Sequence, residues 1–518
     1  MKTRLLNNKS AAINVVFLII HFMLQLFLAM HHEAWRDESQ AWIIARNASF
    51  SEILGLCPSE GHPCLWFFLL KVCCMCGVSF YSLSFISIVI MAVAVGLLLW
   101  KAPFGFFTKV CVLLSPVFFY YNPVICRIYS VVVLLIVLLC VCWPERRRYP
   151  ITYGIIVALL FQSHILIAGL AIGCLIEIII NYKDLVENKN AAVGFIIPII
   201  SFVFMILELR QTSKTETFIN ITAGHVISRM HIHSILGSVH SVSRFFDAGQ
   251  VMTGIAALFV CFVAFLIYIH KLFKDQVFRQ KAGNHFVVVL CGFLGYWGII
   301  VFIRSATHVQ MASVFLMIML FFVWTETSIS KRINHEAERE EKSNDDSTEV
   351  DFNSFKHYLV NNIIEILFLI CCLLLIPKSA LIDPLSDVKG QFSGGMEMAA
   401  MVDDIAPDGS VIALHNDMLC TSIAAYLYES ENKYTIWDID NECEFRIHKW
   451  GRMNKRVLQD MQLYEIIKED CGSDNNVYFI NSTQELETTP ISSENMKVIG
   501  RNTEPNTWSE YYQLYELD

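Results

Sequence analysis

The sequence predicts an α-helical polytopic membrane protein with a small α/β domain towards its C-terminal end. The chain of 518 residues is 55% hydrophobic and only 17% charged, which is more apolar than a soluble domain usually is. Several apolar runs reach the roughly 18–20 residues that a membrane-spanning helix needs. After residue 380 these runs give way to short strand patterns. The formal net charge of −9 gives no reason to expect nucleic acid as a partner.

Eleven apolar runs are interpreted as membrane spans. They lie at 11–30, 80–100, 106–121, 129–143, 150–163, 165–180, 191–208, 251–270, 285–303, 310–325 and 358–377. The two runs within 150–180 leave a second interpretation open, which is one long tilted helix. The first run lacks a small-x-small cleavage site, so we expect an uncleaved helix rather than a signal peptide.

Basic segments set the expected orientation, because Lys and Arg gather on the cytoplasmic side of a membrane protein. The N-terminus and the segments 144–150, 271–281 and 331–340 are basic. Placing all of them inside predicts a multi-pass protein of the cell membrane. Its N-terminus is then cytoplasmic and its C-terminus extracytoplasmic.

The first outer loop, 31–79, contains a short apolar segment, Gly61–Gly77. Counting this segment as a span would invert every later loop. We therefore expect a juxtamembrane helix at the outer interface, with Trp66 and Lys71 at the height of the lipid headgroups.

Two domains follow from these patterns, a transmembrane domain at 1–379 and an extracytoplasmic α/β domain at 380–518. The run "GSVIALHNDMLCTSIAAYL" from Gly409 is typical of a strand, a turn and a helix, and "NNVYFINST" from Asn475 of another strand. A long outer loop is expected near 209–249. The charged loop 333–352 is expected to be disordered.

Most of the 17 cysteines lie in apolar runs, where free Cys behaves as a small hydrophobe. Cys57 and Cys64 could form a disulfide across the first outer loop. Two of Cys420, Cys443 and Cys471 could form another.

The expected topology collects ionisable and polar residues from distant parts of the chain on the outer face. They are Asp37, Glu38, Arg46, Glu60, His62, Arg127, Tyr129, His164, Arg304 and His308. The two adjacent acids, Asp37 and Glu38, are the candidate catalytic residues, and the other eight are candidates for binding substrate or phosphate. Carboxylates, imidazoles and guanidiniums on one face suit phosphate binding with acid–base chemistry beside it.

Each of these residues also has a purely structural interpretation. Asp37 would be the N-cap of an interfacial helix that begins near Glu38. Arg127 and Tyr129 would be interfacial anchors, and Arg304 would extend its charge to the interface. Only the joint occurrence on one face favours a functional site.

Two motifs of the first outer loop resemble the GT-C class of integral-membrane glycosyltransferases. They are "DESQAWIIAR" at 37–46 and "EGHPCLW" at 60–66. The resemblance in style is to protein O-mannosyltransferases and to the aminoarabinose transferases of lipid A, and above all to a poorly characterised bacterial branch. Arg127-Ile128-Tyr129 is similar to the R-x-Y of that branch, and Arg304 with His308 resembles its late Arg/His pair.

The resemblance implies a GT-C-like fold and transfer of a sugar, with inversion, from a polyprenyl-phosphate donor. The acceptor, a lipid, a glycan or a protein, stays open. In such a mechanism Asp37 takes the proton of the acceptor hydroxyl, and Arg127, Arg304 or His62 neutralises the phosphate. Glu38, about 100° further round a helix, would orient a partner or a metal.

The sequence departs from the named transferases near the end of the third span, where they carry a second acid. Asn122 and Arg127 stand in this neighbourhood instead. A mechanism that rests on Asp37 with cationic help is therefore expected. The need for a divalent cation, Mg²⁺ or Mn²⁺ at Asp37 and Glu38, stays open.

Two other functions are weighed against glycosyl transfer. A transporter or flippase of a lipid-linked or anionic substrate would need ionisable residues deep in its spans and inverted repeats. The expected spans are almost free of charge, with Glu177 and Glu208 near helix ends, and no repeat is evident. An assembly or sensor protein would bind its ligand in the tail. There His415, Asn416 and Asp417 cluster after a strand, which a simple turn also explains.

Overall fold

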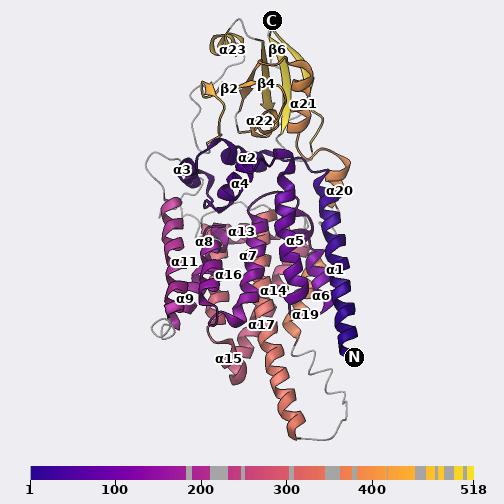
Figure 1. The fold of residues 1–518 in the computed structure, drawn as a ribbon, viewed down its shortest axis with the longest axis vertical. Coiled ribbons are helices and arrows are strands. Elements are labelled where there is room, and N and C mark those ends of the chain that lie inside the picture. Colours follow the sequence, from indigo (N-terminus) through magenta and orange to yellow (C-terminus); the bar gives the residue numbers. More distant parts are fainter. Residues whose placement is uncertain are drawn as a thin grey trace.

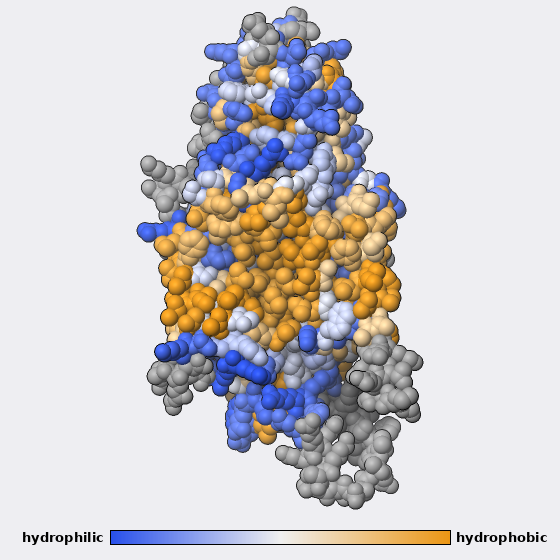
Figure 2. All heavy atoms as spheres, in the orientation of Figure 1, coloured by the Kyte–Doolittle hydropathy of each residue, from blue (hydrophilic) through white to orange (hydrophobic). Residues whose placement is uncertain are grey.

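The computed structural model is a bundle of helices with a β-sheet at one end (Figure 1). It describes residues 2–181, 189–210, 232–246, 251–302, 309–344, 362–375, 382–416, 418–449, 463–472, 476–483, 495–505 and 510–517. The N-terminus lies at the end of the bundle opposite to the sheet (Figure 1). On the face shown in Figure 2, apolar side chains form a broad band across the bundle between two more polar ends.

Six helices in the described part of the chain are long and apolar enough to cross a bilayer. They are α1 (Lys2–Ala29), α5 (Leu83–Lys101), α11 (Lys189–Glu208), α14 (Val251–Lys274), α16 (His285–Phe302) and α17 (Val309–Asn344). Many of their apolar side chains face outwards, such as Ile200 and Phe259, which are 63% and 64% exposed. Such exposure in a soluble protein would be costly, and it fits helices that face lipid.

The other expected spans are shorter helices, so a count of eleven spans is not confirmed. They are α6 (Phe106–Leu113), the π-helix η2 (Val117–Tyr121), α7 (Tyr129–Cys142), α8 (Pro150–Phe161), α9 (Ala168–Ile180) and α19 (Ile363–Leu375). At about 1.5 Å per residue, a helix of 12 to 14 residues is roughly 18–21 Å long, against a hydrocarbon core of about 30 Å. The run 106–121 is divided just before Pro116, which has no N–H for a helical bond.

The run 150–180 forms two helices rather than one. The chain turns at Gln162–His164 and passes through the short 3-10 helix η4 (Ile165–Ile167) into α9. At the other end of this hairpin, the Arg146 Nη2 atom lies 3.0 Å from the Glu177 carboxylate. Since that contact joins the segment before α8 to the end of α9, the turn at His164 is the tip of the hairpin.

Two stretches that were expected to be irregular contain helix. The expected loop 209–249 includes α13 (Ile232–Phe246), which packs against α14. Helix α17 continues to Asn344, through the first part of the segment 333–352 that was expected to be disordered, and the rest of that segment lies outside the described residues. Residues 333–344 are rich in Glu and also contain Lys, Arg and Ala, all of which favour helix. Glu336 also accepts from Lys281 of α15 (Gln276–Ala282) and from Arg332 one turn earlier.

Three short helices of the first loop lie across the end of the bundle that carries the sheet (Figure 1). They are α2 (Arg36–Asn47), α3 (Phe50–Glu60) and α4 (Leu65–Met75), and the 3-10 helix η1 (Phe80–Ser82) follows. A capping box between Ser49 and Glu52 begins α3, and Gly61, with φ of 71°, ends it.

Two expectations for this loop are wrong. The N-cap of α2 is Trp35, so Asp37 lies inside the first turn and does not cap the helix. Glu38 instead accepts from the backbone N–H of Trp35 at 3.3 Å. Trp66 is only 4% exposed and belongs to the core, so it is not a surface anchor.

The sheet has six strands in the order β3-β2-β1-β4-β6-β5. The strands are β1 (Val411–His415), β2 (Thr435–Asp438), β3 (Cys443–Glu444), β4 (Val477–Thr483), β5 (Met496–Arg501) and β6 (Tyr511–Leu517). β1 is parallel to β2 and β4, whereas β3 and β6 run antiparallel to their neighbours. The expected strands near 411 and 477 are thus the two central parallel ones.

Successive side chains of β1 point to opposite faces of the sheet, so the apolar core of this domain has two layers. Ile412 and Leu414 join the core that includes α21 (Gly395–Ile405) and α22 (Thr421–Leu427), on the side of the bundle. Val411 and Ala413 pack with α23 (Leu463–Cys471) on the other face. The helix α20 (Ile382–Lys389) precedes the domain. All five cysteines considered for disulfides are free.

Close backbone contacts at glycine hold neighbouring helices of the bundle together. A Cβ at Gly169 of α9 would lie 2.6 Å from the carbonyl oxygen of Cys291, and one at Gly295 of α16 would lie 2.5 Å from the Cα of Gly169. Only residues without side chains permit this approach, as in other membrane helix pairs.

Gly169→Val is expected to separate α9 from α16 and to destabilise the fold by about 3 kcal/mol, the upper part of the range for overpacked cores. Thermal unfolding in detergent measures the effect. Gly298→Val in α16 is the matched control, because no atom lies within 4 Å of a Cβ there. Equal melting temperatures of the two variants would contradict the packing described here.

Candidate functional site

Asp37 lies in the first turn of α2 and contacts Arg127, which comes from the segment between η2 and α7. One guanidinium nitrogen of Arg127 is 2.9 Å from a carboxylate oxygen of Asp37. The side chains are 13% and 20% exposed, so both groups are partly accessible. The Arg36 Nε atom lies 3.8 Å from the other oxygen of Asp37. The sequence analysis expected these two distant residues on one face of the protein, and the structure places them in direct contact.

Three carboxylates act on the Arg127 guanidinium. Burial opposes its charge, but Asp37, with smaller contributions from Glu38 and Glu60, raises the pKa of Arg127 above its ordinary value. Arg127 is therefore a fixed cation at the junction of the bundle and the first loop. Its guanidinium also lies 5.9 Å from the ring centre of Tyr129.

A group of aromatic and imidazole side chains continues from Arg127 into the bundle. The Tyr129 hydroxyl is 3.1 Å from His164 Nε2, and the rings of His62 and His164 have centres 4.8 Å apart. The backbone N–H of Leu166 donates to His164 Nδ1 at 3.1 Å. A neutral His164 therefore carries its proton on Nε2, directed at the Tyr129 oxygen.

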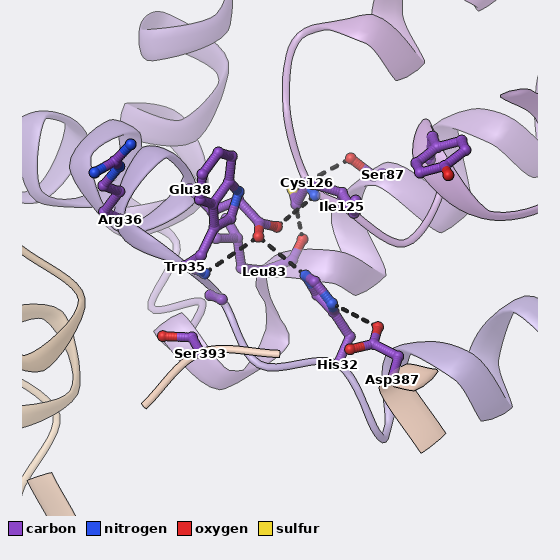
Figure 3. Close-up of polar contacts among 12 residues, drawn as sticks. His32, Trp35, Arg36, Glu38, Leu83, Ser87, Ile125, Cys126, Asp387 and Ser393 are labelled. Atoms are coloured by element: carbon purple, nitrogen blue, oxygen red, sulfur yellow. Dashed lines mark hydrogen bonds and ion pairs between the residues drawn. The ribbon is translucent and has the colours of Figure 1, made fainter. Parts of the chain in front are cut away.

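Glu38 has a different environment from Asp37, although the two are adjacent. Its side chain is fully buried, and its oxygens accept from Cys126 N–H at 2.5 Å and from Trp35 N–H at 3.3 Å. One oxygen also lies 3.0 Å from His32 Nε2. Figure 3 shows Glu38 turned inwards between these partners. All of these contacts are within the protein, so Glu38 holds the loop in place.

His32 lies between two carboxylates and links three parts of the chain. Its Nδ1 is 2.9 Å from Asp387 of α20, on the side of the ring opposite to Glu38 (Figure 3). The Tyr120 hydroxyl of η2 donates to the same Asp387 oxygen at 2.7 Å. Burial opposes the charge on the ring, but Glu38 and Asp387 outweigh it and raise the pKa of His32 to about 10.

The remaining sequence candidates lie in different parts of the chain. Glu60 accepts from the Gln40 side chain at 2.9 Å and so stays near α2. Arg46 lies at the far end of α2, and its guanidinium pairs with Glu429 of the sheet domain at 2.8 Å. Arg304 and His308 lie outside the described residues.

Sequence reasoning missed His32 and Asp387, which hold the first loop. His32 was visible as one of the residues between the first apolar run and the "DE" pair. No sequence pattern pointed to Asp387, because it lies 355 positions after His32 in a polar stretch without a motif.

The carboxylates of Asp37 and Glu38 have different partners, the guanidinium of Arg127 and the backbone N–H of Cys126 respectively. Within the described residues, no group of three or more His, Cys, Asp or Glu side chains has the geometry to hold a metal ion.

No protein-family model and no curated protein matches this chain. The resemblance to GT-C transferases therefore stays a prediction.

His32→Gln is expected to destabilise the protein by about 3–5 kcal/mol at pH 7, because two buried carboxylates lose their cation. The folded pKa of His32 is about 10, above the ordinary value of 6.5. Its contribution to stability is therefore complete below pH 6.5 and is lost as the pH rises towards 10. Melting temperatures between pH 6 and 10 should fall less steeply in the variant than in the wild type.

The matched control is His31→Gln. His31 is the exposed neighbour, and its Nδ1 atom lies 2.8 Å from the carbonyl oxygen of Phe27 in α1. Parallel pH profiles for wild type and His32→Gln would show that His32 is not charged in the folded state.

Proposed function

We propose that this chain is a membrane glycosyltransferase that takes a sugar from a polyprenyl-phosphate donor at the outer face of the cell membrane. The observation that carries the proposal is the Asp37–Arg127 pair at 2.9 Å, with Tyr129, His164 and His62 adjoining it. A carboxylate beside a fixed guanidinium offers a base next to a phosphate-binding group. The resemblance of the first-loop motifs to those of GT-C transferases supports the same function.

The donor phosphate would bind the Arg127 guanidinium and replace Asp37 as its principal partner. The Asp37 carboxylate, which is normally ionised at neutral pH, is then available to an acceptor hydroxyl. As the acceptor oxygen bonds to the anomeric carbon, its proton passes to Asp37. The bond from that carbon to the phosphate oxygen breaks, and polyprenyl phosphate leaves with the electron pair, stabilised by Arg127. Attack opposite to the leaving group inverts the anomeric carbon.

The Tyr129–His164–His62 group would define the wall of the donor site. The fixed tautomer of His164 keeps Tyr129 in place, so the phenol ring lies beside the Arg127 guanidinium in a constant position. A planar guanidinium positioned in this way favours two hydrogen bonds to one phosphate.

The orientation we propose has the sheet domain outside and the N-terminus in the cytoplasm. Basic side chains at the opposite end of the bundle support it, including Arg146, Arg147, Lys281 and Lys331. The reacting groups would then face the side of the membrane where lipid-linked sugars can meet an extracytoplasmic acceptor.

One observation favours the alternative of a transporter or flippase. Lys271 of α14 pairs with Glu326 of α17 at 2.8 Å, and Glu326 is only 1% exposed. A buried ion pair between spans is a common feature of transport pathways. The pair lies towards the end of the bundle opposite to Asp37, however, with Lys271 in the last turn of α14. Translocation of a lipid-linked sugar across vesicles without bond cleavage would favour this alternative.

Asp37→Asn is expected to reduce sugar transfer at least 10³-fold, because an amide cannot take the acceptor proton. The assay supplies a panel of polyprenyl-phosphate hexoses and pentoses in vesicles, with membranes of expressing cells as the acceptor source, and measures release of polyprenyl phosphate. Asp404→Asn, a change of an exposed acid on α21, is the control and should have full activity. A fully active Asp37→Asn protein would rule out the proposed mechanism.

Arg127→Lys and Arg127→Gln test the phosphate site. Lysine retains the charge but loses the paired donors, so we expect the KM for the donor to rise about tenfold, and about a hundredfold or more with glutamine. Arg501→Gln, at an exposed arginine of β5 in the sheet domain, serves as the control for loss of a cation. An unchanged donor KM in Arg127→Gln would remove Arg127 from the site.

A further inference from the structure

Helix α2, which carries Asp37, contacts the sheet domain near its N-terminal end and in its middle. The backbone N–H of Ala34, just before the helix, donates to the Tyr426 hydroxyl at 3.1 Å. The N–H of Arg36 donates to Glu510 at 3.1 Å, and the Gln40 side chain donates to the carbonyl of His448 at 2.8 Å.

The C-terminal end of α2 is held by the same domain. Arg46 pairs with Glu429 at 2.8 Å, and its guanidinium lies 5.1 Å from the ring centre of Tyr428. The Asn47 side chain donates to the carbonyl of Arg446 at 2.8 Å, and Arg446 donates back to the Asn47 carbonyl at 2.7 Å. Contacts with the sheet domain thus extend over the whole length of the helix.

The contacts of α2 with the bundle are made by other residues. Asp37 pairs with Arg127, and Glu38 accepts from Cys126 N–H. Trp42, only 2% exposed, belongs to one apolar core that includes residues of both the bundle and the sheet domain. The helix therefore lies between the two parts, and its position relative to Arg127 depends on both.

Glu510 contacts the first turn of α2, in which Asp37 lies. Arg36 is the first residue of α2, and a backbone N–H at that position has no acceptor within its own helix. One oxygen of Glu510 supplies the acceptor, and the other accepts from the Ser393 hydroxyl. Glu510 is 1% exposed, so water does not replace it easily. A carboxyl group at a helix N-terminus also favours the helix electrostatically.

We propose that the sheet domain is a positioning part of the candidate site, and that Glu510 is the residue that fixes the first turn of α2 so that Asp37 reaches Arg127. The importance of this positioning for catalysis rests on the proposed glycosyl transfer. The positioning itself is a property of the fold, and it is measurable without any substrate.

The test compares amide hydrogen exchange in the purified full-length protein in nanodiscs. Glu510→Ala removes the acceptor, so exchange over Arg36–Glu38 should become at least tenfold faster, while peptides over β1 and β4 keep their wild-type rates. Glu510→Gln keeps one acceptor oxygen and should stay within about threefold of wild type. Glu516→Ala, an exposed acid on β6, the strand that directly follows Glu510, is the matched control.

Unchanged exchange over Arg36–Glu38 in Glu510→Ala would overturn the proposal. Should Glu510→Ala also loosen β1 and β4, Tyr426→Phe decides, because it removes only the hydroxyl that accepts from Ala34. Faster exchange over Ala34–Asp37 in that variant supports positioning by the sheet domain, and wild-type exchange overturns it.

Activity provides a separate readout. If the wild type transfers sugar, Glu510→Ala should lower kcat at least tenfold with a donor KM within about threefold of wild type, and Glu510→Gln should restore at least half of the rate. Full activity of Glu510→Ala would contradict the positioning role. If the wild type shows no transfer, the proposed function fails, while the exchange result still decides whether Glu510 positions α2.

Discussion

The architecture of the first loop depends on one buried cation, the imidazolium of His32. An isolated carboxylate in a buried position carries a large desolvation cost, and two of them would repel each other. His32 lies between Glu38 and Asp387 and offsets both charges, with contacts of 3.0 and 2.9 Å. The same three groups bring together the end of α1, the start of α2 and the segment that leads to the sheet. The direction of α2, and with it the place of Asp37, follows from this arrangement.

Two polar residues near Arg127 lie at the ends of short helices of the bundle. Tyr129 begins α7, and His164 forms the tip of the hairpin between α8 and α9. Helices of this length end before the full thickness of an apolar layer, and the helices of the first loop lie across their ends (Figure 1). The polar side chains of Tyr129 and His164 are thereby gathered near this end of the bundle, close to Arg127.

Hydropathy and charge predicted the long helices and the strands at 411 and 477, because these depend on local periodicity. The spans assigned to the run broken at Pro116 and to the short helices α7 to α9 are not confirmed, since hydropathy measures composition and not helix length. That Asp37 and Arg127 lie on one face was expected from topology, whereas their direct contact was not. The partners of Glu38 were not predictable, because one of them is the backbone N–H of Cys126 and another depends on Asp387, far along the chain. Arg46 was assigned to the site because no pattern in the sequence shows that Glu429 lies next to it.

The bond between Arg36 and Glu510 joins residues that are 474 positions apart. A ribosome completes α2 early, but the acceptor for its first N–H emerges only after all the intervening helices and most of the sheet have been made. The final geometry of the candidate site is therefore among the last features to form during synthesis. Until Glu510 is made, the N–H of Arg36 lacks this acceptor, so under the positioning proposed above the first turn of α2 is fixed only once the chain has reached the start of β6.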